Sequence, residues 1–505
     1  MAAISNADFS DMQGLLRFGY GKMTEASYLL LNITDPAKAA TWLAHAEVAT
    51  AETKSPPPRS AMQIAFTAQG LQRLGVPEQI MNGFSAEFLS GMCGETNRSR
   101  RLGDVGENAP AYWLWGNPSA LPDLVVLLYA HKDQFQQWVE SIKFQLNEFG
   151  CTILQRLDTN DMGDIEPFGF ADGISSPVID WDQKRDPSGD KLDYENVSMV
   201  GEFILGYPNE YGLYTTRPTI DDATADLPSV DSSSDVKDLG RNGSYLVFRQ
   251  IDQDVHGFWQ YLSSQSGNDH SSTTELAEQL VGRRMSGEPL VETTQKTIIG
   301  VGPDANDLRL NGFDYSHDSN GFSCPIGAHI RRANPRNADL PSGTSDSRWG
   351  KLSRTLALDR LLGHDELDRD RDRVASTRFH RLLRRGREYG PLLNQEQRME
   401  PATPGEASSG LHFISLGANI GRQFEFVQSA WLHNSAFDGL SDENDPLTGN
   451  RETVEGCPAA NFTIQVKGGV RKRLHNIPNF TKIRGGAYFF LPGVRALRYI
   501  ARTCK

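Results

Sequence analysis

The sequence predicts an α+β protein with antiparallel sheets, built from two similar halves. Short apolar runs alternate with amphipathic stretches along the chain, which is typical of mixed strands and helices. Two segments 217 residues apart resemble each other, and in each a Trp follows a Ser-Tyr pair, 14 residues after the Tyr. With 505 residues the chain also exceeds one ordinary core, so two or more domain-sized units are expected.

Each of the two similar segments predicts a buried strand followed by an amphipathic helix. The strand and helix lie at 27–31 and 36–48 in the first copy, and at 244–248 and 254–263 in the second. Asp35 and Asp252 stand at matching positions between strand and helix. An internal duplication explains the likeness, and chance similarity over so short a stretch is the alternative.

The remaining elements continue this alternation in both halves. Strands are expected at 61–66, 124–130, 410–416 and 485–491, helices at 68–74 and 132–147, and either helix or strand at the aromatic-rich 423–431.

Two stretches differ in composition from their surroundings. Residues 215–237 are rich in Asp, Ser, Thr and Pro and predict an acidic linker or loop. We therefore divide the chain into an N-terminal half at 1–215, a linker at 216–237 and a C-terminal half at 238–505. The charge-dense stretch 337–379 predicts a solvated helix or surface insertion within the second half.

Composition narrows the function classes. The net charge of −13 argues against nucleic acid as a partner, because phosphate binding needs a basic field. No basic segment followed by an apolar run opens the chain, and no apolar run is long enough to span a membrane. The five cysteines lack the spacing of a disulfide framework or a zinc site. These features predict a soluble, cytoplasmic protein.

The run CPIGAHIRRANPR at 324–336 contains the first candidate for site chemistry, His329. A lone histidine is more often structural than a ligand, but Gly327 and Ala328 leave room for a flat cofactor beside the imidazole. A neutral histidine nitrogen is a common ligand of haem iron. Planar guanidinium groups suit carboxylates such as haem propionates, and three follow the histidine: Arg331, Arg332 and Arg336.

The run GFADGISSP at 169–177 presents a second candidate, Asp172. Its neighbours favour irregular backbone, so a turn capped by the aspartate is one interpretation. The other is an acid held in an apolar cavity, where burial raises its pKa and lets it shuttle a proton.

Two further runs could complete such a cavity. In HRLLRRGREYG at 380–390 the halt at Gly386 allows one arginine to point inward while its neighbour points outward. In GLHF at 410–413, strand alternation would place Leu411 and Phe413 on one side.

Taken together, GFADGISSP, CPIGAHIRRANPR, LRRGREYG and GLHF resemble the dye-decolorizing peroxidases, a family of haem peroxidases. The resemblance extends from about residue 11 to the end of the chain. The chain's size, its long segment between His329 and Arg384 and its missing signal peptide resemble the larger, intracellular type of the family. The resemblance implies two ferredoxin-like halves of the dimeric α+β barrel type, with one haem b per chain in the second half.

The resemblance also implies a role for each candidate. His329 would be the proximal iron ligand, Asp172 the distal acid–base residue and Arg384 the distal arginine, with Arg385 the alternative if the register is off by one. Leu411 and Phe413 would form the apolar distal wall. Asp445 matches the acidic partner of the proximal histidine, and an Asp-Pro turn is the other interpretation. Of the three arginines, Arg331 is expected to meet the propionates.

The expected reaction is peroxidase chemistry. Hydrogen peroxide would oxidise the haem to a ferryl state, and dyes, phenolics or other organic donors would reduce it. Bulky donors cannot pass Leu411 and Phe413, so they would react by electron hopping through a surface aromatic, with Tyr389 and Trp431 as candidates. One departure stands out: Arg387 and Glu388 replace the hydrophobic residue and proline usual after the distal arginine.

Two other classes of function compete with this one. A non-catalytic haem-binding, storage or sensing protein would need His329 but not both Asp172 and Arg384. A hydrolase would need a nucleophile motif or a metal cluster, and the sequence shows neither. The sequence leaves open the physiological donor, the choice between a monomer and a homo-oligomer, and the relative weight of Asp172 and Arg384.

Overall fold

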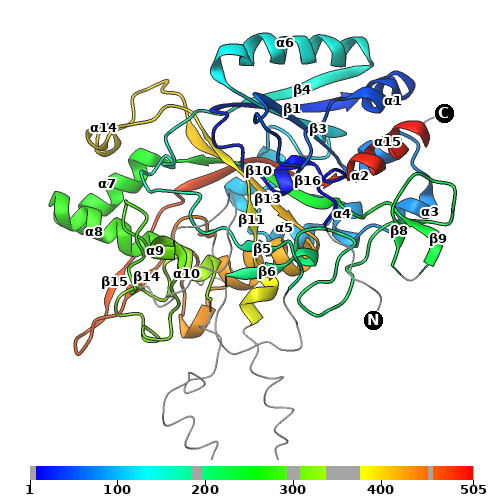
Figure 1. The fold of residues 1–505 in the computed structure, drawn as a ribbon. Helices are drawn as coiled ribbons and strands as arrows, with labels where there is room; N and C mark the ends of the chain where they lie inside the picture. The colour runs from blue at the N-terminus through cyan, green and yellow to red at the C-terminus, as the bar shows by residue number, and fades with distance from the viewer. Residues whose placement is uncertain are drawn as a thin grey trace, which may run out of the picture.

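A nine-stranded antiparallel sheet runs through the molecule in the order β11-β13-β10-β16-β2-β3-β1-β4, with β12 also paired to β13 (Figure 1). The computed structural model describes residues 7–184, 196–231, 233–292, 308–336, 376–452 and 459–503. The greater part of the insertion expected at 337–379 lies outside these ranges.

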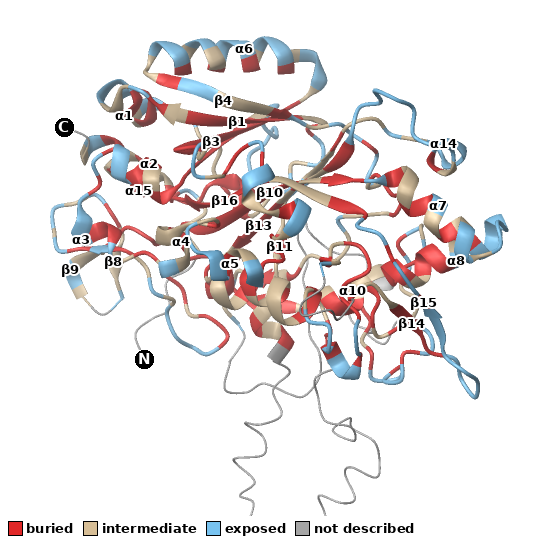
Figure 2. Cartoon of the chain, turned by 180° about the vertical axis from the view of Figure 1, so that it is seen from behind, coloured by how far each residue is buried: buried red, intermediate tan, exposed pale blue. Residues whose placement is uncertain are grey.

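The first half of the sheet has the β-α-β-β-α-β order of a ferredoxin-like fold. Its elements are β1 (Glu25–Ile33), α1 (Pro36–His45), β2 (Ser60–Phe66), β3 (Leu124–Ala130), α6 (Lys132–Glu148) and β4 (Cys151–Asp158). The strand order β4-β1-β3-β2 is the ferredoxin-like one. β3 is apolar at six of its seven positions and is buried throughout, as expected for a central strand. α6 buries Phe135, Val139, Ile142 and Leu146 on one face and exposes the other (Figure 2).

The second half repeats this arrangement. Its elements are β10 (Ser244–Gln253), α7 (Val255–Gln265), α8 (His270–Val281), β11 (Leu383–Arg384), β12 (Arg387–Tyr389), β13 (Ser409–Gly417), two π-helical segments (Gly421–Glu425 and Val427–Leu432) and β16 (Thr481–Leu491). The order β16-β10-β13 with β11 and β12 outermost matches the first half. The predicted pair of ferredoxin-like halves is therefore confirmed, and the aromatic-rich stretch 423–431 is helical.

The two similar segments form equivalent strand–helix units, but the helix begins at a slightly later position in the second unit. Asp35 caps α1 by accepting a hydrogen bond from Lys38 N, at 3.1 Å. In the second half Asp254 does this for α7, accepting from Gly257 N at 2.9 Å, whereas Asp252 lies within β10. The second strand is thus longer before its helix begins, and the match of Asp35 with Asp252 is wrong.

The halves join where β16 pairs with β2, at Phe490 and Phe66. The sheet then curls until its two edges touch. Asn160, just after β4, donates its backbone N–H to the carbonyl oxygen of Glu388 on β12, at 2.9 Å. His412 Nε2 on β13 donates to the carbonyl of Asp158, at 3.1 Å. No ladder between the described strands closes the sheet into a complete barrel.

The stretch predicted as an acidic linker contains a small three-stranded sheet. Its strands are β7 (Thr219–Ile220), β8 (Ser229–Val230) and β9 (Ser233–Asp238), in the order β7-β9-β8. The domain boundaries drawn from composition stay a prediction. Within the described ranges, no helix combines the length and the apolar character needed to cross a membrane.

Candidate active site

A cavity lies against one face of the second half's sheet. Three neighbouring strands contribute alternate residues to its wall: Arg249, Ile251 and Gln253 from β10, Leu411 and Phe413 from β13, and Thr481 and Ile483 from β16. Alternate residues of a strand share one face of the sheet, so the intervening side chains lie on the opposite face, away from this cavity. α10 (His329–Ala333), part of the helical segment near 427–433 and the loop around 166–177 supply the other walls.

His329 begins α10 and lines this cavity. Its Nδ1 lies 2.9 Å and 3.0 Å from the two carboxylate oxygens of Asp445. The Nδ1–H therefore donates to the carboxylate, and Nε2 is the ring nitrogen left with a lone pair. A histidine held in this way presents Nε2 to a metal in a fixed tautomer and orientation.

Asp445 is wholly buried and holds its position through further hydrogen bonds. Its Oδ1 accepts from the backbone N–H groups of Leu447 and Thr448, at 3.0 Å and 2.8 Å, and from the Thr448 hydroxyl. Burial alone would raise the pKa of Asp445, but the charge of His329 and these donors hold that pKa well below its usual range. Burial lowers the pKa of His329, and the Asp445 carboxylate outweighs burial and raises it.

Asp172 and Arg384 meet at the same cavity, although they are 212 residues apart in sequence. Arg384 Nη1 donates to Asp172 Oδ1 at 2.9 Å, and each side chain is about one-third exposed. Both groups act electrostatically on His329, so all three belong to one charged environment.

The pKa of Asp172 moves in the direction opposite to the one predicted from an apolar cavity. Burial does raise it, but the Arg384 guanidinium and the Gly173 backbone N–H outweigh burial, and the pKa lies below its ordinary value. Asp172 is therefore a carboxylate over most of the accessible pH range. The predicted upward shift is wrong because the positive charge of Arg384, together with the hydrogen bonds to Asp172, outweighs the effect of burial.

Leu411 and Phe413 both line the cavity, as the strand alternation requires. His412 between them lies on the opposite face, where it contacts Tyr28, Phe248 and Tyr389. The cavity thus has an apolar wall beside its pair of charged groups.

The small residues before His329 pack closely against their neighbours. A side chain at Gly327 would stand 3.3 Å from the ring of Phe462 and 3.4 Å from Leu440. Ala328 is fully buried against Gly282. Packing against neighbours therefore accounts for the small residues before His329, whose ring lines the cavity.

Arg331 does not line the cavity. Its guanidinium donates to the carbonyls of Asp318 and Cys324 and to the Asp318 carboxylate, at 2.8–3.2 Å. Arg332 points into the protein as well and donates to the carbonyls of Trp431, Glu443 and Asn434. Neither placement agrees with the expectation that these guanidinium groups meet a cofactor.

The cavity wall instead contains Arg283, which no sequence motif singled out. Its hydrogen bonds go to neutral oxygens, the carbonyls of Gly287 and Leu310 and the hydroxyl of Ser175. Burial and the nearby charge of Arg336, which also lines the cavity, lower its pKa to about 10, so it stays charged near neutral pH. This part of the wall is suited to an anionic group.

The two aromatic residues expected at the surface are buried. Tyr389 is 8% exposed, stacks on His412 and donates its hydroxyl to Asp252. Trp431 is 9% exposed and packs on Phe426 and His380. Their predicted surface position is wrong, because packing of the second half covers both rings.

Two arginines that follow Arg384, Arg385 and Arg387, connect the two halves. Arg385 Nε donates to the carbonyl of Leu15 at 3.0 Å, and Arg387 donates to the carbonyls of Met23 and Tyr20, both at 2.6 Å. Arg385 therefore reaches toward the first half and is absent from the cavity wall, so Arg384 is the arginine beside Asp172. Arg387 serves as a tie where the family pattern has an apolar residue.

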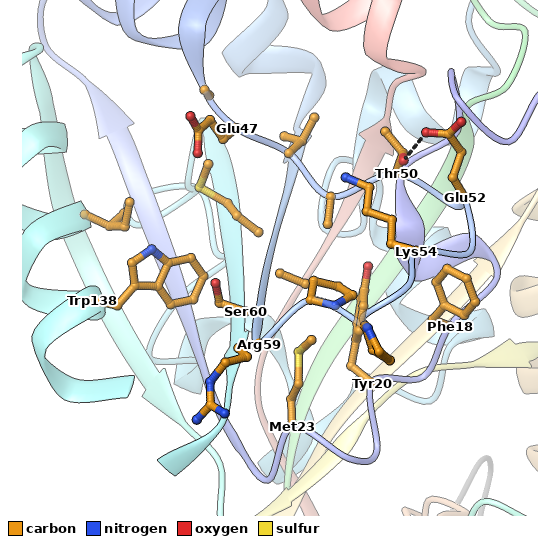
Figure 3. A pocket seen from close by; sticks show the side chains of 18 of the residues that line it. Phe18, Tyr20, Met23, Glu47, Thr50, Glu52, Lys54, Arg59, Ser60 and Trp138 are labelled. Atoms are coloured by element: carbon orange, nitrogen blue, oxygen red, sulfur yellow. Dashed lines mark hydrogen bonds between the residues drawn. The ribbon is translucent and has the colours of Figure 1, made fainter. Parts of the chain in front are cut away.

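A second cavity, of about 1960 Å³, is lined mainly by the first half, together with Val494 and Arg498 near the C-terminus. Figure 3 shows Phe18, Tyr20, Met23 and Trp138 around it, with Glu47 and Lys54 among its polar groups. It shares no lining residue with the cavity that holds His329 and Asp172.

Comparisons with known proteins point to one family. A dye-decolorizing peroxidase of Mycetinis scorodonius is 25% identical over 98% of this chain and 87% of its own length. One of Auricularia auricula-judae is 26% identical over the same shares. The crystal structure of a fungal DyP-type peroxidase from Auricularia auricula-judae superposes with a TM-score of 0.70 and 24% identity, covering 99% of this chain and all of that one. No protein-family model matches the chain.

Proposed function

We propose that the chain is a dye-decolorizing peroxidase, because members of that family match it in sequence and fold over nearly its whole length, and that its own residues perform peroxidase chemistry as follows. The proposed reaction is reduction of hydrogen peroxide coupled to oxidation of dyes, phenolics and other organic donors, with one haem b per chain. The cytoplasmic location inferred from the sequence stays a prediction.

The observation that carries the proposal is the content of one cavity. A histidine locked by a buried carboxylate and an aspartate–arginine pair line the same space. A haem-binding protein without turnover needs the histidine alone. The joint presence of Asp172 and Arg384 favours the enzyme.

The residues present fit a haem. His329 Nε2 would ligate the iron and Leu411 and Phe413 would supply apolar contacts. Arg283 and Arg336, in place of Arg331, would supply positive charge toward the propionates. When bound, haem supplies the iron at which peroxide is activated and the oxidising equivalents that the donors consume.

The chain's own groups then manage protons and charge. The Asp172 carboxylate would accept a proton from peroxide and return it to the oxygen that leaves as water. Arg384 keeps Asp172 ionised and offers its remaining N–H donors to the negative charge on the departing oxygen. Asp445 makes the imidazole of His329 a stronger electron donor by accepting its Nδ1–H.

Purified protein from haem-replete cells tests the proposal directly. We expect a Soret band and bleaching of an anthraquinone dye that requires hydrogen peroxide. A Soret band without peroxide-dependent bleaching would support the non-catalytic alternative, and no haem at all would overturn both.

Replacing Asp445 by asparagine should keep haem bound but weaken electron donation from the imidazole of His329 to the iron. An amide has one acceptor oxygen where the carboxylate has two. If this oxygen keeps the N–H donors of Leu447 and Thr448, the NH₂ group faces Nδ1–H of His329 and cannot accept from it. We expect a more positive midpoint potential in a spectroelectrochemical titration and a roughly 10- to 100-fold slower reaction with peroxide. An unchanged potential would show that Asp445 has only a structural part.

A further inference from the structure

Asp172 stands at the end of a tight turn that has an acid of its own, Glu166. The backbone N–H of Glu166 donates to the carbonyl of Phe170 at 2.9 Å, and Gly169 N–H donates to the carbonyl of Glu166 at 2.8 Å. Ile165 and Ala171 pair across the base of the turn. The position of Asp172 therefore depends on how this turn is held.

The Glu166 carboxylate fills the turn from inside. One oxygen accepts from Phe170 N–H at 2.9 Å, and the other accepts from Phe168 N–H at 3.0 Å. The second oxygen also accepts from the side-chain amide of Gln253, at 2.7 Å. Gln253 belongs to β10, so this contact connects the turn to the sheet that forms the cavity wall.

Glu166 is buried among charged groups that it shares with Asp172. It lines the same cavity as Asp172. Burial, together with the nearby charge of Asp172, raises the pKa of Glu166 to about 7 despite the three donors. Asp172 and Glu166 both raise the pKa of Glu388 on β12, and Glu166 raises the pKa of the buried Arg398 against the effect of burial.

We propose that Glu166 is a positioning residue for catalysis: it fastens the turn at 166–170 to β10 and thereby keeps the Asp172 carboxylate at Arg384. This inference rests on the proposed function. The proposal gives a role to Glu166, which lies outside the run GFADGISSP at 169–177. It also explains why the Glu166 carboxylate accepts a hydrogen bond from Gln253 in the cavity wall.

Glu166→Gln in the haem-loaded enzyme tests the proposal. The amide keeps the size of the side chain, but its NH₂ group cannot accept one of the backbone N–H bonds. Asp172 should then separate from Arg384, and loss of the guanidinium should raise the pKa of Asp172 by more than removal of the Glu166 charge lowers it. We expect the reaction with peroxide to slow about 10- to 100-fold, its acid limb to move to higher pH, and hydrogen exchange in residues 164–174 to speed up.

A double-mutant cycle separates positioning from a merely structural effect. Arg384→Leu alone should also move the acid limb to higher pH. If Glu166 acts through the Asp172–Arg384 contact, adding Glu166→Gln to Arg384→Leu should change the rate by about twofold or less. The full single-mutant loss in that background would overturn the proposal, as would an unshifted acid limb in Glu166→Gln.

Two further variants keep the test decisive. Gln253→Met removes only the link to β10 and should move the acid limb the same way by a smaller amount, even if Glu166→Gln fails to fold. Asp123→Asn is the matched control, because this buried carboxylate of the first half accepts hydrogen bonds from Ile33 N–H and Arg73. The substitution should lower the melting temperature and leave the acid limb of the pH profile in place. Wild-type protein that bleaches no dye would refute the proposed function, whereas active wild type with an equally active Glu166→Gln would refute only this inference.

Discussion

Replacing His329 by alanine should give a protein that loses haem, or keeps it without the histidine-ligated Soret spectrum. Asp445 holds the imidazole by its Nδ1–H, which leaves Nε2 for the proposed bond to iron, and alanine offers no ligand. The change also strands a fully buried carboxylate, and a charged group that loses its partner costs at least about 1–3 kcal/mol of stability. Haem content and the optical spectrum measure the first effect, and denaturant unfolding measures the second.

Added imidazole provides the matched control for this variant. A His329→Gly protein leaves a hole beside Asp445 into which free imidazole can bind, donate its N–H to the carboxylate and present its other nitrogen to the iron. Colour and turnover should return with imidazole concentration. A His329→Ala protein with the wild-type spectrum would show that another residue ligates the iron.

Replacing Asp172 by asparagine should keep haem and slow the reaction with peroxide roughly 10²- to 10⁴-fold, the usual contribution of a general acid–base group. The amide can still accept a hydrogen bond from Arg384, but it takes up no proton from peroxide. Rapid mixing with hydrogen peroxide, followed at the Soret band, measures the rate. Asp164→Asn is a suitable control, because Asp164 lies in the same loop with an exposed side chain.

The pKa of Asp172 also determines how the rate of the peroxide reaction should change with pH. Burial would raise the pKa of Asp172, yet Arg384 holds it below the ordinary value. Because the ionised form is the one that accepts a proton, the wild-type rate should persist into acid and fall only when the pH drops through this lowered pKa. The acid limb should vanish in Asp172→Asn. A wild-type rate that already falls near neutral pH would point to a different base.

Much of the fold is predictable because it depends on local patterns. The apolar run at 124–130 and the repeated strand–helix segments each carry their signal within a few residues, and the structure confirms them. The pairing of β16 with β2 has no such signal, because its one ladder pair, Phe490 with Phe66, joins residues 424 positions apart. Sequence alone also missed the slip between Asp35 and Asp254, which only a defined strand end reveals.

The candidate site divides in a similar way. Asp172, His329 and Arg384 stand in distinctive runs, and the structure brings them to one cavity. Where a long side chain points depends on tertiary partners, and this is why Arg331 turns to Asp318 while Arg283 lines the cavity. Glu166 cannot be recognised from the sequence, because a glutamate before a turn has no signature apart from its hydrogen bonds. Burial of Tyr389 and Trp431 likewise depends on neighbours distant in sequence.

The central place of β16 has a consequence for how the protein is made. This strand lies between β10 and β2, supplies Thr481 and Ile483 to the cavity and is translated after every other described strand. During synthesis the first half can close its own four strands, whereas β10 keeps an unpaired edge until residues 481–491 leave the ribosome. We therefore expect haem to be captured only after translation of β16, so that ribosome-bound chains ending before it should emerge without pigment.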